Sequence, residues 1–248
     1  MHAPAQLDRW ERHYHRTGFV HVPAVFSGAE IAGFRQECER LWADQVVGAR
    51  TDGGSEEALP FRVDRRDRTD GSRIPERLDP VLDISPPFAA LVDDERVRTL
   101  VERLLGEPAR LFKDKLIFKA PGTVGYPLHQ DFAYISFMDL PADSQLAVCI
   151  AIDDAGEANG AMEIYPGLHR ELFATTLDEN HVIEAHRVGS VDPHLLCMAA
   201  GDLLVFHALA PHRSAPNATS SPRRLLYLTF NRASDGDFHD TYYRLGKP

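Results

Sequence analysis

Seven short segments with the composition of β-strands follow one another in the second half of the chain. They are rich in β-branched and aromatic residues and span residues 110–119, 126–136, 146–153, 161–165, 182–188, 202–207 and 225–231. Turn-forming stretches such as PGTVG, DDAGEANG and PNATSSP separate them. Many short strands joined by such turns are typical of a β-sandwich or a barrel. This part of the chain is therefore predicted to be a β core.

The chain before residue 109 has a different pattern, which favours helices. Helices are predicted at 7–16, at 28–46 and at about 87–105, and Gly18 and Gly106 follow the first and the third. Ser27 and Glu30 have the spacing of a capping box at the start of the second. With no internal repeat and no low-complexity linker, one domain is expected over residues 1–248. In it, a helical front at about 1–108 packs on one outer face of a β core at about 109–231.

Residues 50–77 are dense in charge and punctuated by glycines. Two interpretations are open. The segment is a solvated loop, or it is a lid over a functional site, since long loops inside compact domains are often functional. Its arginines either face an anionic group or pair with the neighbouring aspartates; they are Arg62, Arg65, Arg66, Arg68 and Arg73.

The overall charge limits the partners of the chain. The formal net charge of the 248 residues is -10, whereas a nucleic-acid-binding protein needs a basic surface to neutralise phosphates. No apolar run approaches the length of a membrane span. The three cysteines, Cys38, Cys149 and Cys197, lie in apolar neighbourhoods and are expected to be free, buried thiols in a reducing cytoplasm. A small molecule is the expected partner, with no nucleic acid and no membrane.

A histidine and an aspartate stand two residues apart in YPLHQDFAYIS, residues 126–136. Side chains at i and i+2 of a strand point to one face, so His129 and Asp131 are predicted to face the same side. They would supply two ligands of a site with two histidines and one carboxylate, which leaves positions on iron(II) open for substrate and oxygen. The alternative is a structural hydrogen-bonded pair, because an H-x-D motif alone is not specific.

A second stretch, GDLLVFHALAPHRSAPNATSSPRRLLYLTF, covers residues 201–230. It contains a strand, a turn with two histidines, and a returning strand that begins with two arginines. Either His207 or His212 could be a third ligand. A guanidinium on the next strand suits a metal chelated by a dicarboxylate, because it could hold the far carboxylate of 2-oxoglutarate in a bidentate contact.

Taken together, the motifs HQD, PGLH, GDLLVFH and PHRSAPN…PRR resemble the phytanoyl-CoA dioxygenase family from about residue 18 to residue 231. The resemblance implies a double-stranded β-helix, or jelly roll. It also implies an enzyme that uses iron(II), 2-oxoglutarate and O2 to hydroxylate a C–H bond of a small metabolite or natural-product intermediate. Succinate and carbon dioxide are the expected by-products.

The same resemblance assigns roles to individual residues. It implies iron ligands at His129, Asp131 and His212, because the third ligand of the family is followed by a serine and then by an asparagine. It implies that 2-oxoglutarate contacts Arg223, which opens the returning strand, and Ser214. It points to Lys119, on the strand before HQD, as a further cosubstrate contact.

Three nearby residues are expected to be structural. His207 ends a strand and is predicted to be packed or hydrogen-bonded, and His169 of the PGLH turn is predicted to support the fold. Arg224 is adjacent to Arg223 and therefore points to the opposite face of its strand. Two other functions stay open: a cupin-type metal enzyme that does not use 2-oxoglutarate, and a non-catalytic module that binds metal or 2-oxoglutarate.

Overall fold

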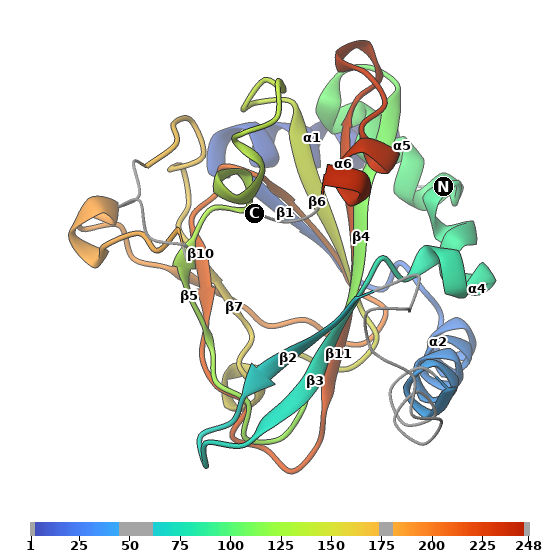
Figure 1. Cartoon of the computed structure of the whole chain (residues 1–248). Helices are drawn as coiled ribbons and strands as arrows, with labels where there is room; N and C mark the ends of the chain where they lie inside the picture. Colours follow the sequence, from blue (N-terminus) through green and yellow to red (C-terminus); the bar gives the residue numbers. More distant parts are fainter. Residues whose placement is uncertain (1–2, 45–61, 174–180, 246–248) are drawn as a thin grey trace.

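The computed structural model describes residues 3–44, 62–173 and 181–245. Two β-sheets pack face to face, and helices lie on the outside (Figure 1). The larger sheet has the order β1-β9-β6-β11-β4-β3-β2, and its strands are β1 (Phe19–Val22), β2 (Arg62–Asp67), β3 (Arg73–Asp79), β4 (Ala109–Lys119), β6 (Gln145–Ala151), β9 (Leu203–His207) and β11 (Arg223–Arg232). The smaller sheet has the order β5-β10-β7-β8, and its strands are β5 (Tyr126–His129), β7 (Met162–Ile164), β8 (His194–Leu196) and β10 (His212–Ser214).

The strand pairs within both sheets are antiparallel. This arrangement confirms the predicted jelly roll, a mainly β fold with flanking helices. Apolar side chains from the facing surfaces of the two sheets fill the space between them; they include Ile117, Cys149, Phe206, Leu225 and Ile164. One end of this space stays open as the cavity described below.

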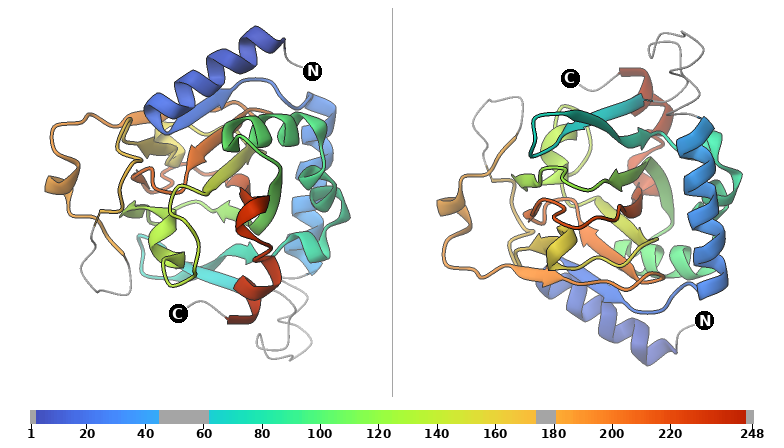
Figure 2. Two further views of the ribbon diagram at one scale, coloured as in Figure 1. Left: turned by 90° about the horizontal axis from the view of Figure 1, so that it is seen from above. Right: turned by 90° about the horizontal axis from the view of Figure 1, so that it is seen from below.

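Helices cover the outer face of the larger sheet, as predicted (Figure 2). The α-helices are α1 (Pro4–Thr17), α2 (Gly28–Leu41), α4 (Pro86–Ala89), α5 (Glu95–Leu105) and α6 (His239–Leu245). Short 3-10 helices connect other elements: η3 (Leu82–Ile84), η4 (Ala90–Val92), η5 (Asp131–Ile135), η6 (Glu157–Asn159), η7 (Ala185–Val188) and η8 (Ala233–Asp235).

Local signals explain where the main helices begin and end. The Ser27 side chain accepts a hydrogen bond from the Glu30 backbone at the start of α2, which completes the predicted capping box. Gly18 and Gly106 end α1 and α5 in the left-handed conformation, with φ of 86° and 79°, which costs glycine little. Buried side chains of α2 and α5, such as Leu41 and Leu100, pack against the outer face of the larger sheet. Each fully buried leucine contributes roughly 1.5–3 kcal/mol.

The structure corrects three expectations. The part of the predicted helical front at residues 62–79 forms the β2–β3 hairpin, which pairs with β4 and extends the larger sheet. Residues 50–61 of the predicted lid lie outside the described residues. The predicted strand at 182–188 contains the 3-10 helix η7, and β8 occurs later. Cys38 and Cys149 are buried, but Cys197, which follows the end of β8, is exposed. Among the residues that the structure describes, no helix is long and apolar enough to cross a membrane.

Candidate metal centre and cosubstrate site

His129, Asp131 and His212 form a compact cluster of possible metal ligands. One donor atom from each lies within 4.8 Å of the other two. His129 ends β5, His212 begins β10, and the two are paired in the register of these strands with ring centroids 4.2 Å apart. The Nε2 atom of His129 lies 3.8 Å from a carboxylate oxygen of Asp131. The set of two imidazoles and one carboxylate suits iron(II) with open positions.

Hydrogen bonds orient both imidazoles toward this cluster. Nδ1 of His129 is 2.7 Å from the Pro127 carbonyl oxygen, and Nδ1 of His212 is 2.9 Å from the Ala210 carbonyl oxygen. If each Nδ1 donates to its carbonyl, each Nε2 keeps its lone pair for a metal. Burial lowers the pKa of both imidazoles, for His129 to about 3. The neutral form, which binds metals, is therefore the stable one at neutral pH.

Asp131 stays ionised although it is buried. Burial acts to raise the pKa of its carboxyl group, but the positive charges of neighbouring groups, Lys115 first among them, outweigh this and lower the pKa. A charged carboxylate beside two neutral imidazoles is the protonation state that a divalent cation requires. The residues present therefore fit iron(II).

The predicted strand at 126–136 ends earlier than expected, and this corrects the argument for Asp131. The strand stops at His129, and Asp131 is the first residue of η5. The Gln130 side chain holds the backbone in place where the chain leaves β5. Its nitrogen donates to the carbonyl oxygens of Leu209 and Glu171, and its oxygen accepts from the Phe173 amide. Asp131 thus reaches His129 from a helical turn and not from the same face of a strand.

Arg223 opens β11 and is 3% exposed. One of its terminal nitrogens donates to the Gly160 carbonyl oxygen at 2.6 Å. Its Nε is buried and has no hydrogen-bond partner among the described residues. A buried guanidinium with an unused donor beside a cavity fits a ligand carboxylate, because leaving that donor unpaired is costly. Ser214 lines the same cavity.

Lys119 lies behind Ser214 and does not belong to the cavity lining. Its ammonium group donates to the Ser214 hydroxyl at 2.9 Å, to the Gly160 carbonyl oxygen at 3.3 Å and to the Ala215 carbonyl oxygen. Burial, helped by the charge of Arg223, lowers the pKa of Lys119 to about 7. Lys119 therefore holds Ser214 and the Gly160 carbonyl oxygen in position, and its expected contact with the cosubstrate stays a prediction.

The three residues expected to be structural lie away from the ligand cluster. His207 accepts a hydrogen bond from the Leu209 amide at 3.0 Å, and its ring centroid lies 5.4 Å from that of His169. Arg224 points to the opposite side of β11 from Arg223 and forms a bidentate pair with Asp153, with distances of 2.7 and 2.9 Å.

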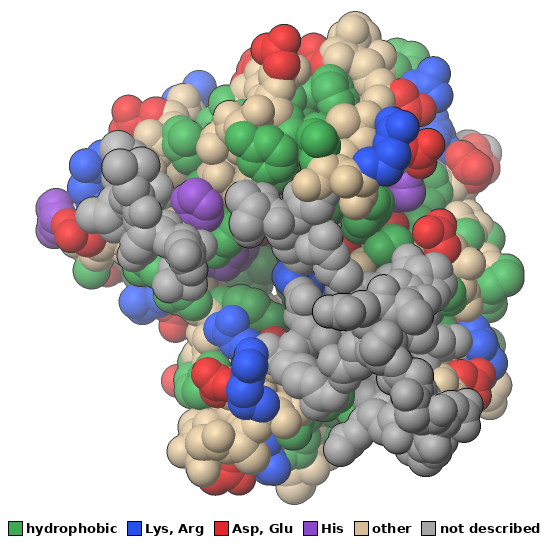
Figure 3. All heavy atoms as spheres, in the orientation of Figure 1, with side chains coloured by type: hydrophobic (Ala, Val, Ile, Leu, Met, Phe, Trp, Pro, Cys, Tyr) green, Lys and Arg blue, Asp and Glu red, His purple; other side chains and the backbone are tan. Residues whose placement is uncertain are grey.

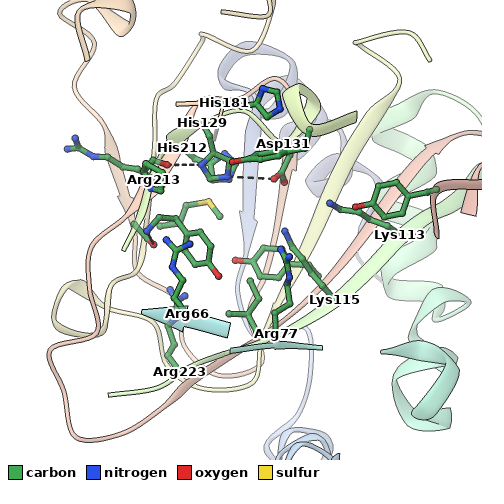
Figure 4. A pocket seen from close by; sticks show the side chains of 18 residues that line it. Arg66, Arg77, Lys113, Lys115, His129, Asp131, His181, His212, Arg213 and Arg223 are labelled. Carbon is green, nitrogen blue, oxygen red and sulfur yellow. Dashed lines mark hydrogen bonds and ion pairs between the residues drawn. The ribbon is translucent and has the colours of Figure 1, made fainter. Parts of the chain in front are cut away.

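A cavity of about 570 Å³ connects the histidine cluster with Arg223 (Figure 4). A Lys or Arg side chain is visible in the hollow at the centre of this face of the molecule, and others lie to its lower left (Figure 3). Six cationic residues line the cavity, and Asp131 is its one lining carboxylate among the described residues; the cations are Arg66, Arg77, Lys113, Lys115, Arg213 and Arg223. Tyrosines supply much of the remaining wall: Tyr126, Tyr134, Tyr227 and Tyr242.

The arginine-rich segment contributes unequally to this cavity. Arg66 lines it, stacks over the Tyr126 ring at 4.0 Å and donates to the Gly125 carbonyl oxygen. Arg68 donates to the Pro121 carbonyl oxygen, and Arg73 pairs with Asp67 at 3.1 Å. The side chains of Arg62 and Arg65 lie outside the described part of the structure. Pairing with a neighbouring aspartate is thus observed for Arg73, and contact of this cluster with an anionic group stays a prediction.

Sequence reasoning missed Lys113 and Lys115. Strand alternation puts them on one face of β4 with Ile117, which also lines the cavity. The period-two pattern in LFKDKLIFK was visible, since two lysines at i and i+2 inside an apolar strand are unusual. What the pattern could not show is that this face points inward.

A family model described as phytanoyl-CoA dioxygenase (PhyH) matches residues 14–225. Among curated relatives, a methylphosphonate hydroxylase of Gimesia maris is 31% identical over 239 residues, which cover 96% of this chain and 84% of the relative. A 2-aminoethylphosphonate dioxygenase of an uncultured bacterium is 28% identical, over 70% of this chain and 65% of that protein. A probable alpha-ketoglutarate-dependent hypophosphite dioxygenase of Stutzerimonas stutzeri is 26% identical, over 90% of this chain and 78% of that protein.

A solved structure with a similar fold is the epimerase SnoN in complex with Fe3+, alpha ketoglutarate and nogalamycin RO. It superimposes with a TM-score of 0.76 at 24% identity and covers 93% of this chain and 85% of SnoN. At this level of identity the likeness shows a shared fold.

Proposed function

The chain belongs to the phytanoyl-CoA dioxygenase family and is an iron(II)- and 2-oxoglutarate-dependent dioxygenase, and we propose that His129, Asp131 and His212 are its iron ligands. The support is the distance of at most 4.8 Å between their donor atoms and the carbonyl contacts that hold both Nδ1 atoms. The cupin-type and non-catalytic alternatives have no comparable support, since the curated relatives described above are named as hydroxylases or dioxygenases.

We place the far carboxylate of 2-oxoglutarate at Arg223. The buried Nε of this residue has a donor to offer, and Ser214 adds a hydroxyl on the same wall. The Gly160 carbonyl oxygen fixes the guanidinium and Lys119 fixes the serine. With its cosubstrate and O2 bound, the iron supplies the oxidising chemistry that inserts oxygen into a C–H bond and releases succinate and carbon dioxide. The tyrosine-lined wall limits access of water to the reacting atoms.

The substrate is proposed to be a small phosphonate. The observation that carries this proposal is the excess of cations in the cavity. Six Lys and Arg residues line it, and Asp131 is its one lining carboxylate among the described residues. Arg223 is assigned to the cosubstrate, and Arg66, Arg77 and Arg213 each have a carboxylate within ion-pair distance. Lys113 and Lys115 remain to favour an anionic substrate. Two relatives are named for phosphonates and a third for hypophosphite, so each acts on a compound of phosphorus and oxygen.

A substrate screen tests this proposal. The iron-loaded enzyme is incubated with 2-oxoglutarate, O2 and one candidate at a time: methylphosphonate, 2-aminoethylphosphonate, L-proline or ectoine. Succinate release is measured, and phosphorus NMR detects a hydroxylated phosphonate. We expect substrate-dependent succinate with a phosphonate and none above background with the other two. The His212→Ala variant is the negative control. Turnover with proline or ectoine and not with either phosphonate would reject the substrate class.

A further inference from the structure

Three of the cations that line the cavity, Lys113, Lys115 and Arg223, lie on the paired strands β4 and β11. In the register of β4 and β11, Lys119 is opposite Arg223 and Lys115 is opposite Tyr227. Lys113, Lys115 and Ile117 alternate along β4 and line the cavity, and Lys119 is on the same face of the strand but lies behind Ser214. Four residues of a strand separate Lys115 from Lys119, which corresponds to roughly 14 Å. The lysine end of the cavity is therefore distinct from the end where Arg223 holds the cosubstrate.

The two lysines differ from the arginines of the cavity in their partners. Three lining arginines each have a carboxylate within ion-pair distance: Arg66 with Glu76 at 3.9 Å, Arg77 with Asp79 at 3.6 Å and Arg213 with Glu163 at 2.6 Å. For Lys113 and Lys115, no carboxylate of the described chain lies within 4.0 Å. Their ammonium groups instead lie 5.3 Å from the Tyr242 ring centroid and 4.9 Å from the Tyr227 ring centroid.

Lys115 lies on the side of the cavity that holds the iron ligands. Figure 4 shows its side chain extending from β4 toward Asp131, while Arg223 lies across the cavity from the ligand cluster. An anion held by Lys115 therefore lies beside the metal.

The formal charges of the lining groups show which anion fits. The two positive charges of iron(II) and that of Arg223 cancel the charge of Asp131 and the two charges of 2-oxoglutarate. The remaining arginines are balanced by their own carboxylates. Lys113 and Lys115 then leave two positive charges, which a dianion neutralises and a monoanion does not.

We propose that Lys113 and Lys115 form the subsite for the dianionic phosphonate group of the substrate, an inference that rests on the proposed function. Because this subsite adjoins the iron ligands, the carbon that is hydroxylated is the one bonded directly to phosphorus. In the reaction, one C–H bond of that carbon becomes C–OH. One oxygen atom of O2 enters the hydroxyl group. The other enters succinate as the bond between C1 and C2 of 2-oxoglutarate breaks and C1 leaves as carbon dioxide. Substrate and 2-oxoglutarate each lose two electrons, the four that reduce O2.

Binding measurements under nitrogen test the subsite without turnover. The probe is methylphosphonate, titrated calorimetrically into enzyme loaded with iron(II) and 2-oxoglutarate. We expect Lys115→Met to weaken methylphosphonate binding on the order of 10²-fold, as for removal of one partner of a buried charge pair. Lys113→Met is expected to weaken it at least about tenfold. The matched control is Arg224→Gln, which removes a cation that pairs with Asp153 on the opposite face of β11 and is expected to leave binding within about twofold of wild type.

Two further measurements test the phosphonate subsite independently of cosubstrate binding and of the proposed function. The dissociation constant of 2-oxoglutarate is expected to stay within about threefold of wild type in both lysine variants, because Arg223 is distant. On the wild-type enzyme, methanesulfonate, a monoanion of similar shape, is expected to bind at least about tenfold more weakly than methylphosphonate. This comparison does not depend on the folding of any variant.

Defined results would overturn the inference. If both lysine variants bind methylphosphonate as wild type does while the wild-type enzyme hydroxylates it, the subsite is wrong and the proposed function stands. If 2-aminoethylphosphonate is hydroxylated at the carbon that bears nitrogen, as seen by NMR, the position of oxidation is wrong. If the wild-type enzyme binds iron and 2-oxoglutarate but no phosphonate, the substrate class fails together with the subsite.

Discussion

His129 and His212 are direct partners in the antiparallel register of β5 and β10, and their ring centroids are 4.2 Å apart. The pairing of β5, which has four residues, with β10, which has three, thus brings together imidazoles that are far apart in the sequence. Asp131 joins them from the first position of η5. Each ligand depends on a different local structure, so each can be removed singly while the other two keep their supports.

Iron binding is expected to depend on His212 and not on His207. His129→Ala, Asp131→Ala and His212→Ala should each lose iron and turnover, because two ligands cannot hold iron(II) against water. Thermal unfolding should change little, since burial of these polar groups contributes little to folding. Metal analysis of the purified variants measures the iron content. His207→Ala is the control, and its loss of iron together with retention by His212→Ala would show that the ligand is misassigned.

Arg223 is expected to determine the affinity for 2-oxoglutarate. Truncating one partner of a buried, hydrogen-bonded charge pair costs roughly 2–5 kcal/mol. Arg223→Ala should therefore raise the dissociation constant of 2-oxoglutarate on the order of 10²-fold in an anaerobic titration. Arg224→Ala breaks the pair with Asp153 on the other face of β11 and should change this constant little. Equal effects of the two substitutions would rule out Arg223 as the specific anchor.

Gly160 is expected to tolerate no side chain. Its φ is +71°, and a methyl group there would overlap the Ala215 carbonyl oxygen and lie 2.6 Å from Nζ of Lys119. Gly160→Ala should displace Lys119 and the carbonyl oxygen that holds Arg223, and should weaken 2-oxoglutarate binding about tenfold or more. Gly156→Ala is the control, because open space surrounds that position. Unchanged binding in Gly160→Ala would mean that Arg223 does not need this support.

The ion pair between α6 and β4 is expected to make stability depend on pH. Nε2 of His239 lies 3.4 Å from the buried carboxylate of Asp114, and this contact raises the pKa of His239 above its ordinary value of 6.5. The stabilisation is fully present below about pH 6.5 and is lost as the pH rises through the raised pKa. His239→Gln should thus cost roughly 1 kcal/mol near pH 6 and less near pH 9.

Urea unfolding of wild type and His239→Gln at the two pH values measures this difference. His186→Gln is the control, because His186 is an exposed histidine beside Glu184, with 71% of its side chain accessible. A larger loss at high pH than at low pH would contradict the assigned direction.

Local patterns were sufficient to predict several elements of this fold. The capping box at Ser27 and Glu30, the glycine that ends α1 and the long apolar strand at β4 are encoded by residues close in sequence. The β2–β3 hairpin was not predictable in this way, because its residues are mostly charged. It forms a sheet through pairing with β4, and such pairing overrides local propensity.

The site also combines features that local sequence predicts with features that depend on long-range contacts. The residues named as ligands lie together, but the strand argument for Asp131 was wrong, since the long-range hydrogen bonds of Gln130 end β5 before it. Lys119 donates to the Ser214 hydroxyl, and its expected contact with the cosubstrate stays a prediction. Lys113 and Lys115 were overlooked because only tertiary structure shows which face of β4 points inward.

The long ladder between β4 and β11 has a consequence for protein engineering. The two strands pair continuously from Lys119 and Arg223 to Ala109 and Arg232, apart from one irregularity near Phe230. Backbone hydrogen bonds hold these two strands together, so the side chains at positions 113 and 115 can be substituted without altering the scaffold. A library restricted to these two positions and to Tyr227 and Tyr242 would sample new substrate charges and shapes while the iron ligands and Arg223 stay constant. The fold thus offers a small, well-separated set of positions for directed evolution of selectivity.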